Sequence, residues 1–162
     1  MKVLQVNKAY WPHTGGVEAV VQVLAEGLSR TPGFRSEVLA CGGAKRTSST
    51  VVSGVPVRYV AQFGTIASLP VSPSYPYWLW RTPADIVHVH DPFPLGDLSV
   101  LLVCAFGKEF RRRKVIVWWH SDIVRQRWAL PFYRVAIGRL LARADKVVVA
   151  SPNHIPSSRV LS

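Results

Sequence analysis

The chain of 162 residues contains little cysteine, few acidic residues and no long apolar run. Its two cysteines, Cys41 and Cys104, lie far apart and form no CxxC pair. This argues against a disulfide framework or a structural zinc site and favours reduced thiols in the cytosol. The longest apolar stretch, residues 98–106, is about half of the roughly 20 residues that a membrane-spanning helix needs. We therefore expect a protein that is soluble or bound peripherally to a membrane. We also expect no signal peptide, because Lys2 leads directly into a strand-like run.

Two nucleotide-binding signatures are missing as well. G-x-G-x-x-G is absent, which argues against a dehydrogenase. A P-loop is absent too, because Gly107 and Lys108 are followed by Glu109 at the end of a predicted helix. The nine Asp and Glu residues stand against 20 Lys and Arg residues, which gives a formal net charge of +11. Such a surplus predicts an anionic partner: nucleotide phosphates, nucleic acid or an anionic membrane surface.

Strand-like and helix-like segments alternate along the chain. Strands are expected at residues 3–6, 37–40, 55–60, 86–90, 115–119 and 146–150, and helices at 19–28, 95–110 and 127–143. The Ser/Thr-rich segment 45–53 predicts a loop, and the proline-containing segment 63–77 predicts irregular structure. Near-continuous Val/Ile strands alternating with helices predict an α/β fold, a Rossmann-like, doubly wound and mainly parallel sheet. The length suits one domain.

Polar or glycine-containing segments follow four of these strands. Ligands of parallel sheets bind at the carboxyl ends of the strands, so we expect the four segments to converge on one binding edge. They are Thr14-Gly15-Gly16, His90-Asp91-Pro92, His120-Ser121-Asp122 and Ser151-Pro152-Asn153.

The glycine pair Gly15-Gly16 lies between the first predicted strand and the first predicted helix. Without a Cβ, these residues let backbone N–H groups approach a ligand. The helix N-terminus behind them favours an anion such as a diphosphate. The alternative interpretation is a tight connection without a binding role.

His88, His90 and Asp91 are similar to part of a metal cluster, because His88 and His90 share one face of a strand. His120 or Asp122 would have to complete it. A metal-dependent hydrolase that uses His88, His90, Asp91 and His120 is therefore one alternative function. The other interpretation makes His88 a buried, hydrogen-bonded residue and lets Asp91 orient the next loop. Asp122 would then cap the following helix.

The predicted helix 127–143 has two distinct faces. One is an apolar core stripe of Leu130, Tyr133, Ile137, Leu140 and Leu141, and the other mixes Trp128, Phe132, Val135, Arg139 and Arg143. The second face suits an anionic membrane surface or a partner domain equally well. A basic nucleic-acid-binding module is a further alternative, although the cations lack interleaved aromatic residues.

Four patterns, in order, resemble the N-terminal domain of family 4 glycosyltransferases, which are retaining enzymes of the GT-B fold. They are PHTGGVE at residues 12–18, DIVHVH at 85–90, WHSDIV at 119–124 and ADKVVVAS at 144–151. The segment HSDIVRQ at 120–126 is particularly similar to bacterial sugar transferases that build surface polysaccharides. The resemblance covers essentially the whole chain.

This resemblance implies transfer of a sugar, with retention, from a nucleotide-sugar donor to a polysaccharide or lipid-linked acceptor. Gly15 and Gly16 would approach the donor diphosphate or sugar. His120 would act as the catalytic residue, contacting a hydroxyl of the donor sugar. Further substrate contacts would come from Thr14, Glu18, Asp91, Asp122 and Ser151. The family needs no metal and no cofactor.

The resemblance also implies a C-terminal nucleotide-sugar-binding domain, which residues 152–162 are too few to supply. We interpret residues 1–162 as the acceptor-side half of such an enzyme, either a shortened chain or one part of a split enzyme. This half alone is expected to be inactive. It would act in the cytoplasm, with its positive charge holding it at the inner face of the cell membrane, and nucleic acid is not an expected partner.

Overall fold

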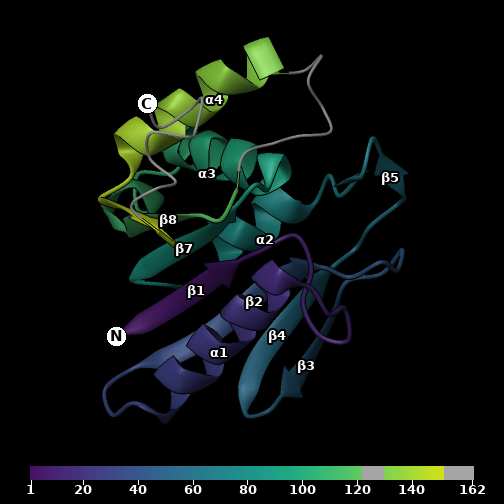
Figure 1. Cartoon of the computed structure of the whole chain (residues 1–162), viewed down its shortest axis with the longest axis vertical. Coiled ribbons are helices and arrows are strands. Elements are labelled where there is room, and N and C mark those ends of the chain that lie inside the picture. The colour runs from purple at the N-terminus through teal and green to yellow at the C-terminus, as the bar shows by residue number, and fades with distance from the viewer. Residues whose placement is uncertain (122–129, 152–162) are drawn as a thin grey trace.

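The structure is a computed structural model and describes residues 1–121 and 130–151. Seven strands form one sheet in the order β3-β4-β2-β1-β7-β8-β9 (Figure 1). Their bounds are β1 Lys2–Val6, β2 Arg35–Cys41, β3 Ser48–Val52, β4 Val55–Val60, β7 Ile86–Asp91, β8 Lys114–Trp119 and β9 Lys146–Val149. β3 and β4 are antiparallel, whereas all other neighbours in this sheet are parallel. The predicted α/β fold with a mainly parallel sheet is confirmed.

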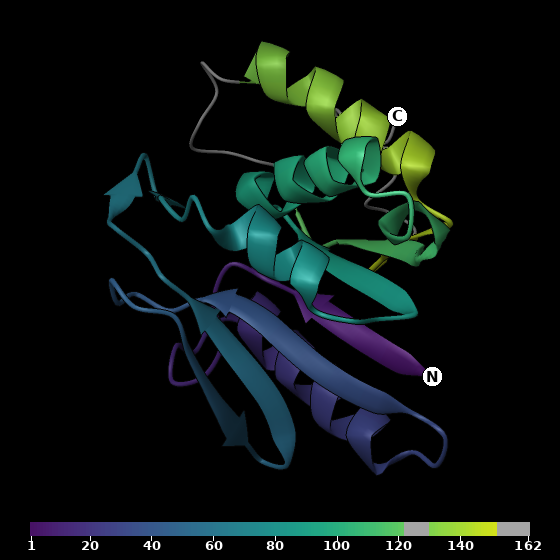
Figure 2. The same cartoon turned by 180° about the vertical axis from the view of Figure 1, so that it is seen from behind.

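Helices cover both faces of this sheet. They are α1 Gly16–Arg30, α2 Tyr75–Arg81, α3 Pro94–Phe106 and α4 Leu130–Arg143, with a 3₁₀ turn at Phe110–Arg112. In Figures 1 and 2, α2, α3 and α4 lie together on one side and α1 lies on the other. Two buried clusters result, one between α1 and strands β2 and β4, and a larger one beneath α2, α3 and α4. None of the described helices is long and apolar enough to cross a membrane.

The structure corrects the predictions of a loop at 45–53 and of irregular structure at 63–77. β3 lies in the first segment as an exposed edge strand, where Ser and Thr side chains face solvent at no cost. The second segment contains the short hairpin β5 Thr65–Ile66 and β6 Leu69–Pro70, followed by α2. Pro76 stands in the first turn of α2, where its missing N–H has no helical partner to lose.

One of the two predicted C-terminal helices, 95–110, ends earlier than expected. The helix α3 ends at Phe106 instead of continuing to residue 110, and the 3₁₀ turn follows it. Residues 127–129 of the other predicted helix, with Trp128, lie outside the described part. The core stripe of α4 is confirmed by the buried Tyr133, Ile137 and Leu140.

Arg143 is not a free cation on the second face of α4. Its Nη2 donates hydrogen bonds to the carbonyl oxygens of Arg111 and Arg113, both at 2.8 Å. The neighbouring Arg113 donates to the carbonyls of Leu79 and Thr82 at the end of α2. These arginines therefore join the ends of three helices, which is a structural use of charge that the sequence analysis did not foresee.

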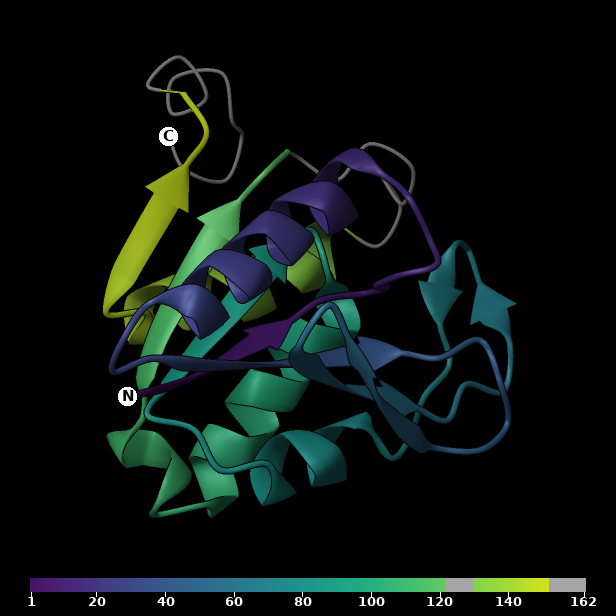
Figure 3. The same ribbon diagram turned by 90° about the horizontal axis from the view of Figure 1, so that it is seen from below.

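The carboxyl ends of β1, β7, β8 and β9 share one edge, because these four strands are parallel neighbours. Figure 3 shows the beginning of α1 and the end of β8 at this same edge. The predicted convergence of the strand-end segments is confirmed for the described residues.

Candidate functional site

The loop after β1 opens directly onto the N-terminus of α1. Gly15 is the N-cap and has no side chain to cap the helix, and the first helical hydrogen bond runs from Ala19 N to Gly15 O at 2.9 Å. The backbone N–H groups that precede Ala19 in the first turn are therefore not used by the helix. Thr14 and Gly16 are exposed, and a Cβ added at Gly16 would meet nothing within 4 Å. A ligand can approach the backbone here.

Glu18 is half-buried in the first turn of α1. Its carboxylate lies where a Cβ on Gly15 would be placed. The carboxylate is the far end of a flexible side chain and can swing away. Gly15 is thus favoured by this close approach, while its extended backbone requires no glycine.

A column of aromatic rings runs along the same face of the sheet as α1, from the middle of β7 to the end of β8. Successive rings are His88, His90, Trp118 and His120, with His88 and His90 centroids 4.5 Å apart. The Trp118 and His120 rings are stacked at 5.3 Å with an angle of 3° between their planes. His88 and His90 are buried, and His120 at the top of the column is half-exposed. The column therefore places one imidazole, that of His120, at the binding edge of the sheet.

The imidazoles are neutral near pH 7 because they are buried. Burial lowers the pKa of His88 to about 4 and that of His90 well below its ordinary value, and neighbouring histidines lower both further. Burial also lowers the pKa of His120. The predicted burial of His88 is confirmed, but the predicted hydrogen bonding is not, since its Nε2 finds no partner among the described residues. His120 reaches the edge in an uncharged form.

Asp91 occupies the opposite face of the sheet from His90. It is fully buried, and its Oδ1 accepts a hydrogen bond from the Phe93 backbone N–H at 3.2 Å. This confirms the interpretation that Asp91 orients the loop after β7. The alternation of side chains along a strand already implied this placement, because His88 and His90 were assigned to one face.

Asp97 on α3 is a buried residue that the sequence analysis missed. It accepts a hydrogen bond from the Tyr133 hydroxyl, while Oδ1 of Asp97 and Oδ2 of Asp91 have no hydrogen-bond partner in the described part of the chain. Burial and the charge of Asp91 raise the pKa of Asp97 well above its ordinary value, and burial also raises that of Asp91. Asp97 is therefore favoured in its protonated form beside Asp91. A single acidic residue within an otherwise apolar helix was the available signal.

The four residues of the hydrolase alternative do not converge. Asp91 faces α3, whereas His90 and His120 hydrogen-bond each other at 3.1 Å across the other face. In residues 1–121 and 130–151, no three His, Cys, Asp or Glu side chains are placed to hold a metal ion. The geometry therefore gives that alternative no support.

Two predicted substrate contacts remain, Ser151 and Asp122. Ser151 follows β9 at the binding edge and is half-buried. Asp122 lies outside the described residues. His120, two residues before it, is anchored by a 3.0 Å hydrogen bond from its backbone N–H to the Asp91 carbonyl.

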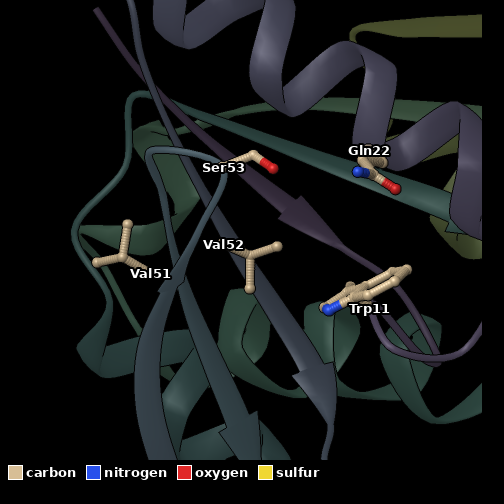
Figure 4. A pocket seen from close by; sticks show the side chains of 5 residues that line it. All are labelled: Trp11, Gln22, Val51, Val52 and Ser53. Atoms are coloured by element: carbon tan, nitrogen blue, oxygen red, sulfur yellow. The ribbon is translucent and has the colours of Figure 1, made fainter.

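A second surface feature is a hollow of about 390 Å³ on the flank of α1 (Figure 4). It is lined by Trp11, Gln22, Val51, Val52 and Ser53. Figure 4 shows that these side chains come from the loop after β1, from α1 and from the β3–β4 hairpin. The Trp11 carbonyl is held by the Tyr59 hydroxyl, so the loop that carries Gly15 is tied to β4.

Comparison with known proteins places this geometry among glycosyltransferases. The chain is 33% identical over 164 residues to the O-antigen chain mannosyltransferase C of Escherichia coli, and 32% identical over 164 residues to the D-rhamnosyltransferase WbpZ of Pseudomonas aeruginosa. Both alignments cover 99% of this chain but only 42% and 41% of the relatives. The chain thus spans less than half the length of these curated relatives.

A solved structure supports the same fold. Sucrose-phosphate synthase from Thermosynechococcus elongatus superposes with a TM-score of 0.64 at 12% identity, covering 93% of this chain and 42% of that one. This neighbour has the GT-B fold of glycosyltransferases. The family model of the glycosyl transferase 4-like domain matches residues 15–154, and the chain belongs to this family.

Proposed function

We propose that this chain is the N-terminal half of a retaining glycosyltransferase that moves a sugar from a nucleotide-sugar donor to a polysaccharide or lipid-linked acceptor. The carrying observation is the shared edge where the free first turn of α1 meets the half-exposed His120 at the end of β8. One element offers backbone donors to a diphosphate, and the other offers an imidazole to a sugar. The mannosyltransferase and rhamnosyltransferase named above favour a surface-polysaccharide acceptor.

The chemistry assigned to this half is positioning and electrostatic stabilisation. Unpaired N–H groups at Gly16 and in the first turn of α1 would stabilise the charge that grows on the departing diphosphate. His120 would contact a hydroxyl of the donor sugar and fix the reacting carbon relative to the acceptor. The substrate cleft would be lined by Thr14, Glu18, Asp122 and Ser151. The buried Asp91 would contribute indirectly, by holding the loop after β7 in place. A second domain would bind the nucleotide.

Sugar transfer by the complete two-domain enzyme tests this assignment. Gly16→Val would place a side chain in the open space before α1, and His120→Ala would remove the imidazole. Gly27→Val is the matched control, because Gly27 lies in the same helix and a Cβ there also meets nothing within 4 Å. We expect sugar transfer to fall at least tenfold in the first two variants and to stay near wild type in the third. Full activity in both site variants would refute the site.

We also propose that the enzyme works on the cytoplasmic face of an anionic membrane. A ridge at the end of α3, formed by Leu102, Phe106, Lys108, Arg111 and Arg112, is exposed, with Phe106 82% accessible. One acidic residue, Glu109, lies within this stretch of the chain, and the three cations of the ridge outnumber it. An aromatic and a leucine rimmed by cations suit the interface of an anionic bilayer.

A further inference from the structure

His120 is the last member of a buried hydrogen-bond chain that begins on β1. Oε1 of Gln5 lies 2.8 Å from Nε2 of His90, and Nδ1 of His90 lies 3.1 Å from Nε2 of His120. Gln5 and His90 are almost completely buried, with 0% and 1% of their surfaces exposed. Because the two residues are shielded from water, their hydrogen bonds have no competing solvent partner.

The chemistry of the first partner fixes the direction of the whole chain. The Gln5 Oε1 atom accepts hydrogen bonds and donates none, so Nε2 of His90 carries a hydrogen. A neutral imidazole has one N–H group, which leaves Nδ1 of His90 as an acceptor. The Nε2 atom of His120 must then donate to it. Nδ1 of His120 is left without a hydrogen.

The groups around His90 keep its imidazole neutral, which preserves this direction of the hydrogen bonds. The titratable groups acting on it are His88 from its own strand and His120 from β8, and both disfavour a positive charge. Gln5 from β1 is uncharged, and Trp118 from β8 stacks over the ring at 6.2 Å. A cationic His90 would donate from both nitrogens and would reverse the bond to His120.

The stacked indole of Trp118 fixes the plane of the His120 ring. The ring planes differ by only 3°, and the hydrogen bond to His90 prevents the ring from turning about its axis. Nε2 therefore points inward along the chain. Nδ1 is the nitrogen left to accept a hydrogen bond, and in the described part of the structure it makes none.

We propose that Gln5 and His90 are positioning residues that hold His120 in its Nε2–H tautomer, so that Nδ1 of His120 accepts a hydrogen bond from a substrate hydroxyl. The part concerning the substrate rests on the function proposed above. The tautomer itself does not, because Gln5, His90, Trp118 and His120 make their contacts without any ligand. Nδ1 of His120 thus favours a ligand group that donates a hydrogen bond, such as an alcohol hydroxyl.

The tautomer is measurable in the 162-residue chain without substrate. Long-range ¹H–¹⁵N correlation spectra of histidine-labelled protein distinguish Nδ1–H from Nε2–H rings. We expect the Nε2–H form for both His90 and His120 in the wild type. An Nδ1–H form for wild-type His120 would overturn the proposal.

Variants of His90 separate tautomer control from simple packing. His90→Phe keeps an aromatic ring but removes the acceptor, so the His120 signal should become a mixture of tautomers. His90→Asn retains an amide oxygen near the former Nδ1 position and should restore the single form. Gln5→Met, which is similar in size to glutamine, provides a second test if His90→Phe fails to fold. An unchanged His120 tautomer in both His90→Phe and Gln5→Met would contradict the relay.

Transfer assays with the complete two-domain enzyme test the substrate part separately. We expect kcat/KM to fall about tenfold in His90→Phe, which is the effect of one weakened hydrogen bond, and to recover in His90→Asn. Normal transfer by His90→Phe, despite a mixed tautomer, would overturn the role toward the hydroxyl. A wild-type enzyme that transfers no sugar would refute the proposed function, while the spectra would still decide the relay.

Discussion

The hydroxyl of Tyr133 on α4 donates a hydrogen bond to the carboxyl of Asp97 on α3, and both side chains are buried. Burial and the nearby charge of Asp91, at the end of β7, raise the pKa of Asp97 well above its ordinary value. The loop that leads to the binding edge is therefore supported by a contact between α3, α4 and β7 that depends on protonation.

Asp97→Asn should remove the pH dependence that Asp97 gives to the free energy of unfolding, without removing the hydrogen bonds. The raised pKa of Asp97 means that its contribution to stability is complete below about pH 4 and is lost as the pH rises toward its folded pKa. An amide keeps an acceptor for Tyr133 and a donor for Asp91. We expect the variant to gain stability relative to wild type between pH 5 and pH 8, by up to about 1.4 kcal/mol per pH unit. Urea unfolding at several pH values measures it.

Tyr133→Phe is the matched control for that experiment. It leaves the Asp97 carboxyl in place but removes the donor, so unfolding should require about 1–3 kcal/mol less at every pH. If Asp97→Asn instead lowers stability as the pH rises, ionisation of Asp97 does not destabilise the fold.

His88→Phe should flatten the loss of stability in acid. The pKa of buried His88 is about 4, below the ordinary value of about 6.5, so folding loses free energy as the pH falls from about 6.5 to 4. A phenyl ring keeps the stack against His90 and Trp118 but cannot be protonated. Thermal unfolding at pH 7 and pH 5 should show a smaller difference than in wild type. The exposed His13, changed to Phe, serves as the control; an equal effect there would contradict this account.

Asp145→Asn should destabilise the protein most at neutral pH. The Lys114 ammonium at 2.8 Å and the Val115 N–H at 2.9 Å hold the pKa of Asp145 at about 2. Its contribution is therefore present above about pH 4 and is lost as the pH falls toward 2. We expect a loss of about 1 kcal/mol at pH 7, since the pair is partly in solvent and is screened. The loss should vanish near pH 2, and a loss that persists there would point to packing instead.

Exchanging the ridge cations should weaken binding to anionic vesicles. Arg111→Ser with Arg112→Ser removes two charges, each contributing about 1 kcal/mol near an anionic surface. Phe106→Ser removes the apolar contact. Sedimentation with vesicles containing phosphatidylglycerol should show weaker binding for both changes, and Arg46→Ser, an exposed cation of the β2–β3 loop, should bind as wild type. Equal binding by all variants would reject the ridge as the membrane contact.

Much of the fold could be predicted from local sequence patterns. Apolar strands at 55–60 and 86–90, and the glycine pair before a helix, allowed the parallel sheet and its binding edge to be predicted. β3 could not be recognised because an exposed edge strand needs no apolar alternation, and its pairing with β4 is a tertiary contact. α2 was missed because three prolines outweighed its aromatic residues, although Pro76 occupies a position that helices accept.

The site was predicted as a set of strand ends but not as a network. Placing His90 and His120 at one edge required only parallel strands. Their mutual hydrogen bond depends on β7 and β8 being neighbours, and the role of Gln5 depends on β1 lying beside β7. The order of strands is a property of the whole chain, so no local pattern contains it.

We infer that this chain forms one half of a glycosyltransferase site. Calorimetric titration with UDP- and GDP-sugars, alone and after a matching C-terminal domain is added, tests this inference. We expect donor binding and sugar transfer only when both halves are present, and weaker binding when Gly16 is changed to Val. No binding and no transfer with any combination of donors and acceptors would contradict the account.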